Sequence, residues 1–247
     1  MLLDVVLFGL LIYQKKIVIN RPSETEYPIR GVDVSYYQGE IDWKVLEGEG
    51  IEFVFIKATE GSSHIDAKFR ENWEQSGSTG LKRGAYHFFS FESEGEAQAE
   101  HFISVVPKEE GMLSPVIDIE FYGDRFYNRP DVEETRKQLQ SLLDRLEEYY
   151  GVKPLIYATE SSYSSYIRGA FDEYPLWIRN VYFSPNMGMP GKWTFWQYDS
   201  EAVLQGYSGE EKYIDLNVFY GGEEEWADFL KDHTVSGEYD TTMIQNS

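Results

Sequence analysis

Strand-like and helix-like segments alternate along most of this chain, and that alternation limits its possible folds more than any other feature. Short runs rich in β-branched and aromatic residues, which predict strands, are separated by segments with the 3.6-residue periodicity of amphipathic helices. In the clearest helical segment, Val132–Tyr150, one apolar stripe is formed by Leu139, Leu142, Leu143 and Leu146. Alternation of this kind predicts a mainly parallel sheet whose strands are connected through helices.

The chain carries eight segments that predict strands. They are Gly31–Ser35, Phe53–Ala58, Gly84–Phe88, Pro115–Ile119, Pro154–Ala158, Leu176–Arg179, Thr194–Tyr198 and Ile214–Val218. Helices are predicted between the early strands, at Trp43–Glu49, Ala67–Gln75, Glu96–Val106 and Val132–Tyr150. The helical signal fades after Ser161–Arg168, and loops join the last three strands. Five strand–helix units followed by three strands predict an α/β fold, an irregular TIM-like barrel of the (β/α)5(β)3 type.

A chain of 247 residues can form one such barrel with a substantial core. We expect the barrel to span residues 29–231, after an N-terminal apolar segment with a linker (residues 1–28) and before a polar C-terminal tail (residues 232–247). The run Met1–Tyr13 is apolar apart from Asp4, but it is short for a membrane span. It is interpreted as a targeting segment or membrane tether of an exported protein, with a peripheral strand or helix packed on the barrel as the alternative.

Composition excludes several classes of partner and chemistry. The 43 acidic against 22 basic residues give a net charge of −21, which argues against nucleic acid and against attraction to anionic lipid. The absence of Cys excludes disulfides, thiolate metal sites and cysteine nucleophiles. The 6 Trp, 19 Tyr and 15 Phe are a heavy aromatic load. Most of these rings are expected in the core, but aromatic faces also stack on sugars, so the load suits a carbohydrate site.

The stretch Val116–Glu120 ends in two carboxylates, Asp118 and Glu120, that lie two residues apart. Side chains alternate faces along a strand, so both carboxylates point the same way, about 6.6 Å apart along the strand. Val116 points to that side as well, and Ile117 and Ile119 point to the other. Like charges at this spacing tend to raise one pKa, which leaves a proton donor beside an anion. Cleavage of a glycosidic bond needs such a pair, although acids also end many strands simply because water is close.

Polar or aromatic residues fall at the ends of all eight predicted strands. They are Asp33, Thr59 with Glu60, Tyr86 with His87, Asp118 with Glu120, Tyr157, Trp177 with Arg179, Gln197 and Asp215. In barrels of this kind the active site lies at the carboxyl ends of the strands. Each residue alone has a structural explanation, such as capping or filling of the barrel. Their coincidence at one rim is what predicts a site.

Other chemistries find less support in the sequence. A cluster of four acids can bind Mg²⁺ or Ca²⁺ through carboxylate oxygens. The four histidines, His64, His87, His101 and His233, form neither an HExxH motif nor a close pair, which argues against a zinc hydrolase. The chain has no G-x-S-x-G elbow for a serine hydrolase and no Gly-rich phosphate motif.

Seven blocks of sequence resemble, in order, those of the glycoside hydrolase family 25 muramidases (lysozymes). They are Asp33–Gly39, Ile56–Gly61, Gly84–Phe88, Asp118–Glu120, Pro175–Ile178, Trp196–Tyr198 and Asp215–Phe219. The resemblance runs from about Ile29 to Leu230. It implies a (β/α)5(β)3 barrel that hydrolyses the β-1,4 bond between N-acetylmuramic acid and N-acetylglucosamine in peptidoglycan. Arg179 departs from the pattern, because smaller residues are more usual at that position.

The resemblance also implies roles for individual residues. Glu120 resembles the family's general acid, which protonates the leaving oxygen and then activates water. Asp118 resembles its partner, acting either as the nucleophile or as the stabiliser of an oxazolinium formed by the substrate's own N-acetyl group. Asp33 and Asp215 match the supporting acids, and Tyr86 is placed to hydrogen-bond the acetamido group. Tyr157, Trp177 and Trp196 are candidate sugar platforms, and Gln197 is a further candidate for contact with substrate.

The sequence therefore predicts a monomeric enzyme that cleaves peptidoglycan glycan strands with retention and needs neither cofactor nor metal. Two alternatives remain open. One is another retaining N-acetylhexosaminide hydrolase of the chitinase-like kind, although Pro115 and Val116 stand where that pattern expects further acids. The other is a non-catalytic peptidoglycan-binding module on the same fold, which has no chemical need for Asp118 and Glu120 together.

Overall fold

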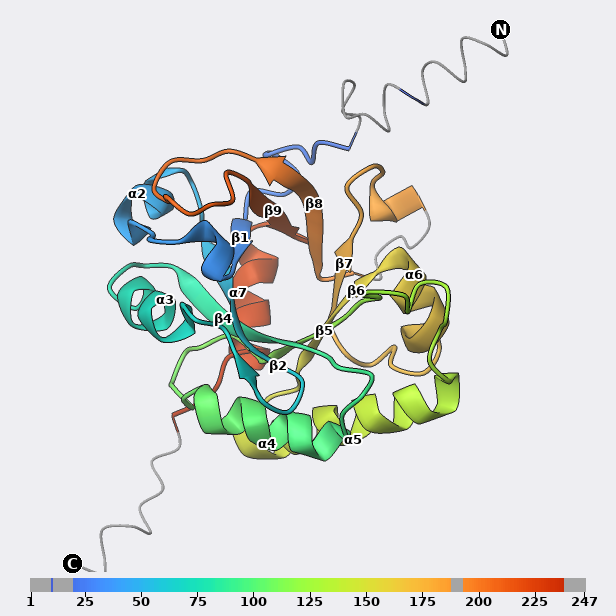
Figure 1. Cartoon of the computed structure of the whole chain (residues 1–247). Coiled ribbons are helices and arrows are strands. Elements are labelled where there is room, and N and C mark those ends of the chain that lie inside the picture. Colours follow the sequence, from blue (N-terminus) through green and yellow to red (C-terminus); the bar gives the residue numbers. More distant parts are fainter. Residues whose placement is uncertain (1–9, 11–19, 188–192, 238–247) are drawn as a thin grey trace, which may run out of the picture.

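The structure, a computed structural model, describes Leu10 and residues 20–187 and 193–237. Its centre is a closed barrel of eight strands surrounded by helices (Figure 1). The barrel strands are β1 (Arg30–Val34), β2 (Phe53–Glu60), β4 (Lys82–Phe88), β5 (Val116–Ile119), β6 (Leu155–Thr159), β7 (Leu176–Arg179), β8 (Phe195–Ala202) and β9 (Ile214–Phe219). Pairing of β1 with both β2 and β9 closes the sheet. The predicted α/β irregular barrel and its eight strands are confirmed.

The last strand differs from the prediction in its direction. Neighbouring strands from β1 through β2 and β4 to β8 pair in parallel, but β9 runs antiparallel to both β8 and β1. Asp215 was expected at the carboxyl end of its strand, and this was wrong, because it is the second residue of β9. It nevertheless lies at the same rim as the other acids, since the amino end of an antiparallel strand meets the carboxyl ends of its neighbours. A short strand not predicted from the sequence, β3 (His64–Ile65), forms a hairpin with the end of β2.

Helices cover the outside of the first strands, as predicted. They are α2 (Trp43–Gly48), α3 (Phe69–Ser76), α4 (Gly95–Val105), α5 (Val132–Tyr150) and α6 (Glu160–Ser162), which continues into a π-helical turn at Tyr163–Ile167. In α5 the backbone N–H of Glu134 donates to the Asp131 side chain at the start, and Gly151 ends the helix in the left-handed conformation. The leucine stripe of α5 is fully buried.

Two apolar layers alternate along the strands. Val116 faces the barrel interior with Phe55, whereas Ile117 and Ile119 face the layer between strands and helices. The alternation predicted for Val116–Glu120 is therefore confirmed by the packing of its apolar residues. Because Asp118 shares the face of Val116, its carboxylate points into the barrel.

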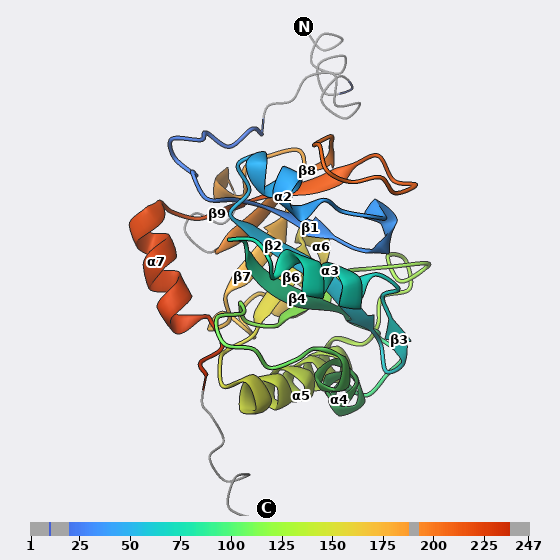
Figure 2. The same ribbon diagram turned by 90° about the vertical axis from the view of Figure 1, so that its left-hand side faces the viewer.

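A helix that the sequence reading did not predict, α7 (Glu223–Asp232), packs against one end of the barrel (Figure 2). Trp226 lies 5.0 Å from Phe219 and 5.7 Å from Phe53, centroid to centroid, and it belongs to the interior cluster. In α7 the apolar residues Trp226, Phe229 and Leu230 are spaced as in an amphipathic helix. The run of three acidic residues before them obscured this helical pattern in the sequence. The helix closes the end of the barrel opposite the carboxyl ends of the parallel strands.

The contacts of the barrel extend slightly past the expected borders at 29 and 231. Asn20 is buried and donates its side-chain amide to the carbonyl of Tyr198 at 2.9 Å, and Tyr27 packs on Trp193. At the other end, Val235 is buried and exchanges backbone hydrogen bonds with the Gly111–Met112 segment. The expected apolar segment lies almost wholly outside the described residues. Within the described part of the chain, no helix is both long enough and apolar enough to cross a bilayer.

Candidate active site

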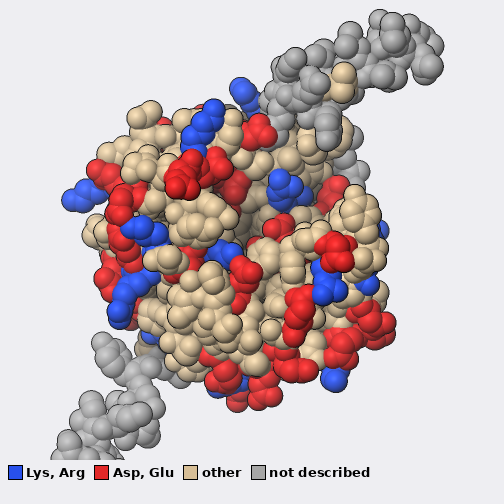
Figure 3. Space-filling model, viewed as in Figure 1, with Lys and Arg blue, Asp and Glu red and all other residues tan. Residues whose placement is uncertain are grey.

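A cavity of about 560 Å³ opens at the rim where the parallel strands end. Figure 3 views this face of the molecule and shows it hollowed near the centre, with acidic and basic side chains around the hollow. Asp33, Asp118, Glu120 and Asp215 all line the cavity. The four acids that the sequence singled out from three separate strands are therefore brought together.

Asp118 and Glu120 occupy different depths at the end of β5. Asp118 is only 7% exposed, and its Oδ1 is buried without a hydrogen-bond partner. Glu120 follows the last residue of the strand and is more exposed. An unpartnered buried carboxylate oxygen is costly to keep ionised. Asp118 lines the cavity, and the fold leaves its buried Oδ1 without a hydrogen-bond donor.

Burial raises the pKa of both members of the pair. For Asp118 the pKa lies well above its ordinary value, first because of burial and then because of the negative charge of Glu120. For Glu120 burial also raises the pKa, while the nearby charge of Arg179 opposes the rise. The two carboxyl groups are electrostatically coupled, so their protons belong to the pair rather than to one residue. A pair of this kind supplies both a proton donor and an anion near neutral pH.

Asp33, on β1, is held by two amides from the neighbouring strands. Gln197 Nε2 donates to its Oδ1 and Oδ2 at 2.9 and 3.2 Å, and Asn217 Nδ2 donates to Oδ1 at 2.7 Å. Both amides are themselves fixed, because Gln197 accepts from Tyr157 Oη at 3.0 Å and Asn217 accepts from Trp177 Nε1 at 2.8 Å. Fully satisfied networks of this kind hold a carboxylate in one orientation.

Asp215 pairs directly with Asp33 across the β1–β9 ladder. Burial, the charge of Asp33 and a hydrogen bond to Asp33 raise the pKa of Asp215 to about 9. Asp215 is therefore protonated at neutral pH and donates to Asp33. Burial raises the pKa of Asp33 as well, and the hydrogen bonds from Asn217, Gln197 and Asp215 oppose that rise. Two ionised carboxylates at this separation would repel each other strongly.

The other predicted residues on the barrel interior also reach the cavity. Tyr86, Tyr157, Trp177 and Gln197 all line it. Burial raises the pKa of Tyr86 and that of Tyr157 well above the ordinary value of 10, so both hydroxyls stay protonated and can donate hydrogen bonds. Tyr157 and Trp177 are 6% and 2% exposed and pack against each other at 4.6 Å. With so little ring face open, they form the wall and floor of the cavity.

Trp196 lies elsewhere. Its ring belongs to the apolar layer outside the barrel, is 2% exposed, and donates Nε1 to the carbonyl of Asn180 at 2.8 Å. Trp196 neighbours Gln197 on the strand, so its side chain points away from the cavity that Gln197 lines. A stacking platform needs an open ring face, and the structure does not bring Trp196 to the site.

Arg179, already noted at a strand end, and two polar residues beyond the predicted set contribute to the site. Arg179 lines the cavity at the end of β7, and Asn217 holds Asp33. Lys57, paired with Glu60 at 2.9 Å, lines a second hollow of about 400 Å³ on the other side of the acids. The two hollows share all four acids and Tyr86, so they form one groove with the acids at its middle. Lys57 and Asn217 lie within two of the seven sequence blocks that resemble the family. Strand alternation in those blocks points both side chains into the barrel, and this could have identified them as site residues.

Within the described residues, no group of three or more His, Asp or Glu side chains is arranged to hold a metal ion. Amide donors and the proton on Asp215 instead hold Asp33, and the charge of Arg179 acts on Glu120. The arrangement of the four acids can move protons at the groove and stabilise developing positive charge.

Comparison with known proteins gives a consistent result. The model of the family described as Glycosyl hydrolases family 25 matches residues 32–207. A solved family 25 glycosyl hydrolase from Bacillus anthracis is 49% identical with a TM-score of 0.79, covering 85% of this chain and 96% of its own.

Two curated proteins are also similar. The uncharacterized protein YegX of Escherichia coli (strain K12) is 36% identical over 223 residues, which is 87% of this chain and 78% of that protein. Lysozyme M1 of Streptomyces globisporus is 32% identical over 216 residues, covering 81% of this chain and 70% of its own length.

The raised pKa of Asp215 predicts how this residue affects the free energy of unfolding as the pH changes. Because its pKa is about 9 in the fold against an ordinary value of 3.8, folding at neutral pH requires proton uptake. The stabilisation from this group is complete below pH 3.8 and is lost as the pH rises through about 9. Asp215→Asn needs no proton and keeps a donor, so it should stabilise the protein at pH 7 by about 1–4 kcal/mol. The gain should vanish near pH 4.

Urea unfolding of both proteins at pH 4 and pH 8 checks this expectation. Asp228→Asn, at a side chain that is 68% exposed, is the matched control and should show no such pH dependence. A stability difference between wild type and Asp215→Asn that is equal at the two pH values would contradict the assignment of the proton.

Proposed function

This chain belongs to family 25 of the glycosyl hydrolases and is a glycoside hydrolase, and on that basis we propose that it cleaves peptidoglycan as a muramidase. The bond proposed is the β-1,4 link between N-acetylmuramic acid and N-acetylglucosamine, hydrolysed with retention. The observation that carries the proposal is the coupled pair Asp118 and Glu120 at the middle of a groove lined by two further acids.

Glu120 is proposed as the general acid and base. It protonates the leaving glycosidic oxygen and then removes a proton from the water that completes hydrolysis. Asp118 is proposed as its partner. Its carboxylate either attacks the anomeric carbon or stabilises an oxazolinium formed when the substrate's N-acetyl group attacks. Both routes retain the configuration at the anomeric carbon.

The reaction needs the proton on Glu120 and the negative charge on Asp118. Within the protein alone, burial raises the pKa of both groups. Arg179 and Lys57 oppose the rise at Glu120, while the charge of Glu120 adds to the rise at Asp118. The positive charge that develops on the sugar in the transition state acts in the opposite sense, because it stabilises an anion at Asp118. A proton on Glu120 and a negative charge on Asp118 are therefore favoured as the glycosidic bond begins to break.

Asp33, Asp215 and Tyr86 are proposed to support this pair. The Asp33–Asp215 pair retains a proton beside the groove, which limits the repulsion between its two carboxyl groups. Tyr86 lines both halves of the groove with a protonated hydroxyl, which suits donation to the acetamido carbonyl or to developing negative charge. Tyr157 and Gln197 act through the orientation of Asp33.

The products of digestion test the bond and the independence from metal. Wild-type protein should release soluble fragments from purified sacculi in buffer containing EDTA, since a carboxylate pair needs no metal. Mass spectrometry of the released muropeptides should find N-acetylmuramic acid at the new reducing ends. N-acetylglucosamine at those ends would refute the muramidase assignment, and activity that is lost in EDTA and restored by a divalent ion would favour a metal mechanism.

Substitution of the acid pair tests the roles. Glu120→Gln keeps the shape of the side chain but cannot deliver a proton, so hydrolysis should fall by roughly 10²-fold or more. Asp118→Asn removes the anion beside the developing positive charge and should also cripple turnover. Turbidity loss of sacculi gives the rates, and circular dichroism confirms folding. Glu74→Gln, at a side chain that is 70% exposed, is the control. A folded Glu120→Gln protein with wild-type activity would overturn the assignment.

We further propose that the protein acts outside the cytoplasmic membrane, because its proposed substrate lies there. We also propose that it acts as a monomer. The apolar run Met1–Tyr13 and the Pro- and Glu-containing segment after it, to about Tyr27, would serve as targeting segment or tether. Fractionation of the native host should recover the protein in the envelope or the medium. Recovery of unprocessed protein solely from the cytosol would count against export, and a dimer on size exclusion would count against the monomer.

A further inference from the structure

The loop that follows Glu120 carries exposed aromatic rings beside the groove. This segment, residues 121–129, which we call the rim loop, connects β5 with α5. Phe121 and Phe126 line the cavity. Phe126 is 52% exposed, and its neighbour Tyr127, which does not line the cavity, is 86% exposed. Apolar surface open to water at the edge of a cavity marks a site where a ligand is bound.

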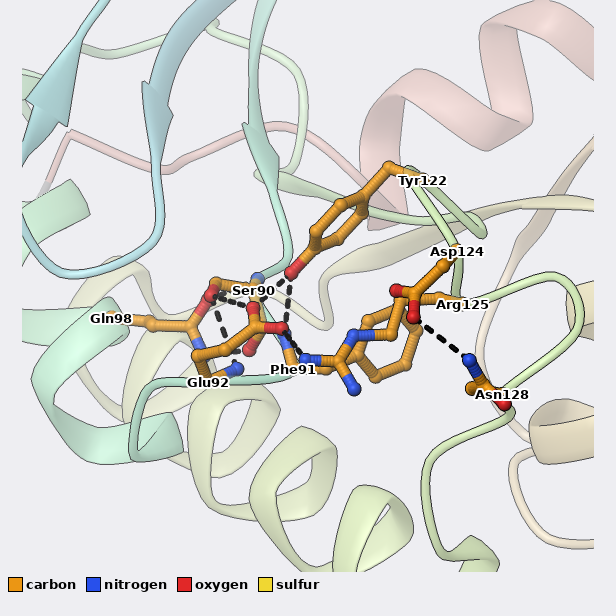
Figure 4. A network of polar contacts seen from close by, with 8 residues as sticks. All are labelled: Ser90, Phe91, Glu92, Gln98, Tyr122, Asp124, Arg125 and Asn128. Atoms are coloured by element: carbon orange, nitrogen blue, oxygen red, sulfur yellow. Dashed lines mark hydrogen bonds and ion pairs between the residues drawn. The ribbon is translucent and has the colours of Figure 1, made fainter.

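The rim loop is fixed to the rest of the molecule through Glu92 (Figure 4). Tyr122 Oη donates to Glu92 Oε2, and the guanidinium of Arg125 pairs with Glu92 Oε1. Tyr122 Oη also accepts from the backbone N–H of Phe91 at 3.2 Å. Partial burial opposes ionisation of Glu92, but the hydrogen bonds from Tyr122, Ser90 and Arg125 lower its pKa. Glu92 is thus an anion held between two loops.

Glu92 is connected in turn to the barrel strands. Ser90 Oγ donates to Glu92 at 3.0 Å, and the backbone N–H of Ser90 donates to Gln98 Oε1 at 2.8 Å. Gln98 Oε1 lies 3.0 Å from His87 Nε2, and His87 Nδ1 lies 2.7 Å from Thr59 Oγ1. Burial lowers the pKa of His87 to about 4, so this link is neutral and intact at neutral pH. A continuous chain of contacts therefore runs from β2 and β4 to the rim loop.

Several contacts support the rings of the rim loop, and one of them is an edge-to-face contact of Phe126 with Tyr127 at 5.5 Å. Phe121 meets Phe126 edge-to-face at 6.1 Å, and the guanidinium of Arg129 lies over both rings, at 5.1 and 5.8 Å from their centroids. Arg129 Nη1 donates to Ser165 at 3.0 Å, which anchors the support. Phe126 is thus held in place while about half of its surface stays open, as a stacking platform requires.

From these contacts we propose that Phe126 forms a sugar-binding subsite for a part of the glycan strand away from the scissile bond, and that Glu92 is the positioning residue that holds it there. The inference rests on the proposed action on peptidoglycan glycan. A saccharide is the occupant because the ring lies on the same cavity as Asp118 and Glu120. A strand cleaved there must pass along the groove. The C–H face of a pyranose ring packs on an aromatic face, while its hydroxyls remain free for the polar walls.

The dependence of KM on substrate length distinguishes a sugar-binding role of Phe126 from a purely structural role. Steady-state kinetics would use muramyl glycan fragments of increasing length, down to the shortest that the wild type cleaves. Phe126→Ala should raise KM for the long fragments by about 3- to 10-fold, the usual worth of an aromatic contact, with kcat within about 2-fold. It should leave the shortest fragment unaffected. Phe183→Ala, at another exposed ring (45% exposed) that does not line the cavity, is the matched control and should change neither constant.

Substitution of Glu92 should have the same effect on KM, because it releases the rim loop that carries Phe126. Glu92→Ala should raise KM for long fragments only. Glu92→Gln, which keeps an oxygen to accept from Tyr122, should restore much of the lost affinity. A change in KM that is equal at all lengths for Phe126→Ala, or no change at any length, would overturn the proposal.

Binding separates this inference from the proposed function. Titration calorimetry with the longest fragment in the Glu120→Gln background should show about 3- to 10-fold weaker binding when Phe126→Ala is added, and no change with Phe183→Ala. If the wild type cleaves no glycan yet this binding pattern holds, the proposed function fails and the subsite stands. If the wild type cleaves glycan but Phe126→Ala binds as tightly as its parent, the subsite fails alone.

Discussion

The hydrogen-bonded position of β9 between β8 and β1 is the constraint on which the site depends. Because β9 runs against both neighbours, its second residue, Asp215, lies at the open mouth of the barrel. The same register sets Asp215 beside Asp33 and lets Asn217, two residues on, donate to Asp33 from inside the barrel. A parallel last strand would have carried Asp215 to the end that α7 closes.

Burial then decides the charge state of the acids that this topology gathers. It is the first cause of the raised pKa of Asp33, Asp118, Glu120 and Asp215 alike. Four ionised carboxylates could not share so small a volume, and the protein relieves the repulsion with a retained proton on Asp215, amide donors to Asp33 and the cation of Arg179.

The aromatic residues divide into two groups by what covers them. Trp177 and Tyr157 fill the barrel beneath the acids and position Asn217 and Gln197 through their polar atoms. Trp196 supports the outer layer. Phe126 belongs to the other group, since a loop braced by Glu92 keeps half of its ring open beside the groove. Residue type alone does not separate these roles, because an aromatic ring is equally suited to a core and to a sugar.

The sequence by itself determined the barrel, its eight strands, and the side on which Val116, Asp118 and Ile117 lie, because hydrophobic periodicity and strand alternation are local properties. It also identified the four acids, through motifs that resemble one family. Only the tertiary structure decided the antiparallel course of β9 beside β1 and the pairing of Asp33 with Asp215 that raises the pKa of Asp215. These depend on which strands pair and on what covers each side chain, and contacts between residues more than a hundred positions apart leave no local pattern in the chain.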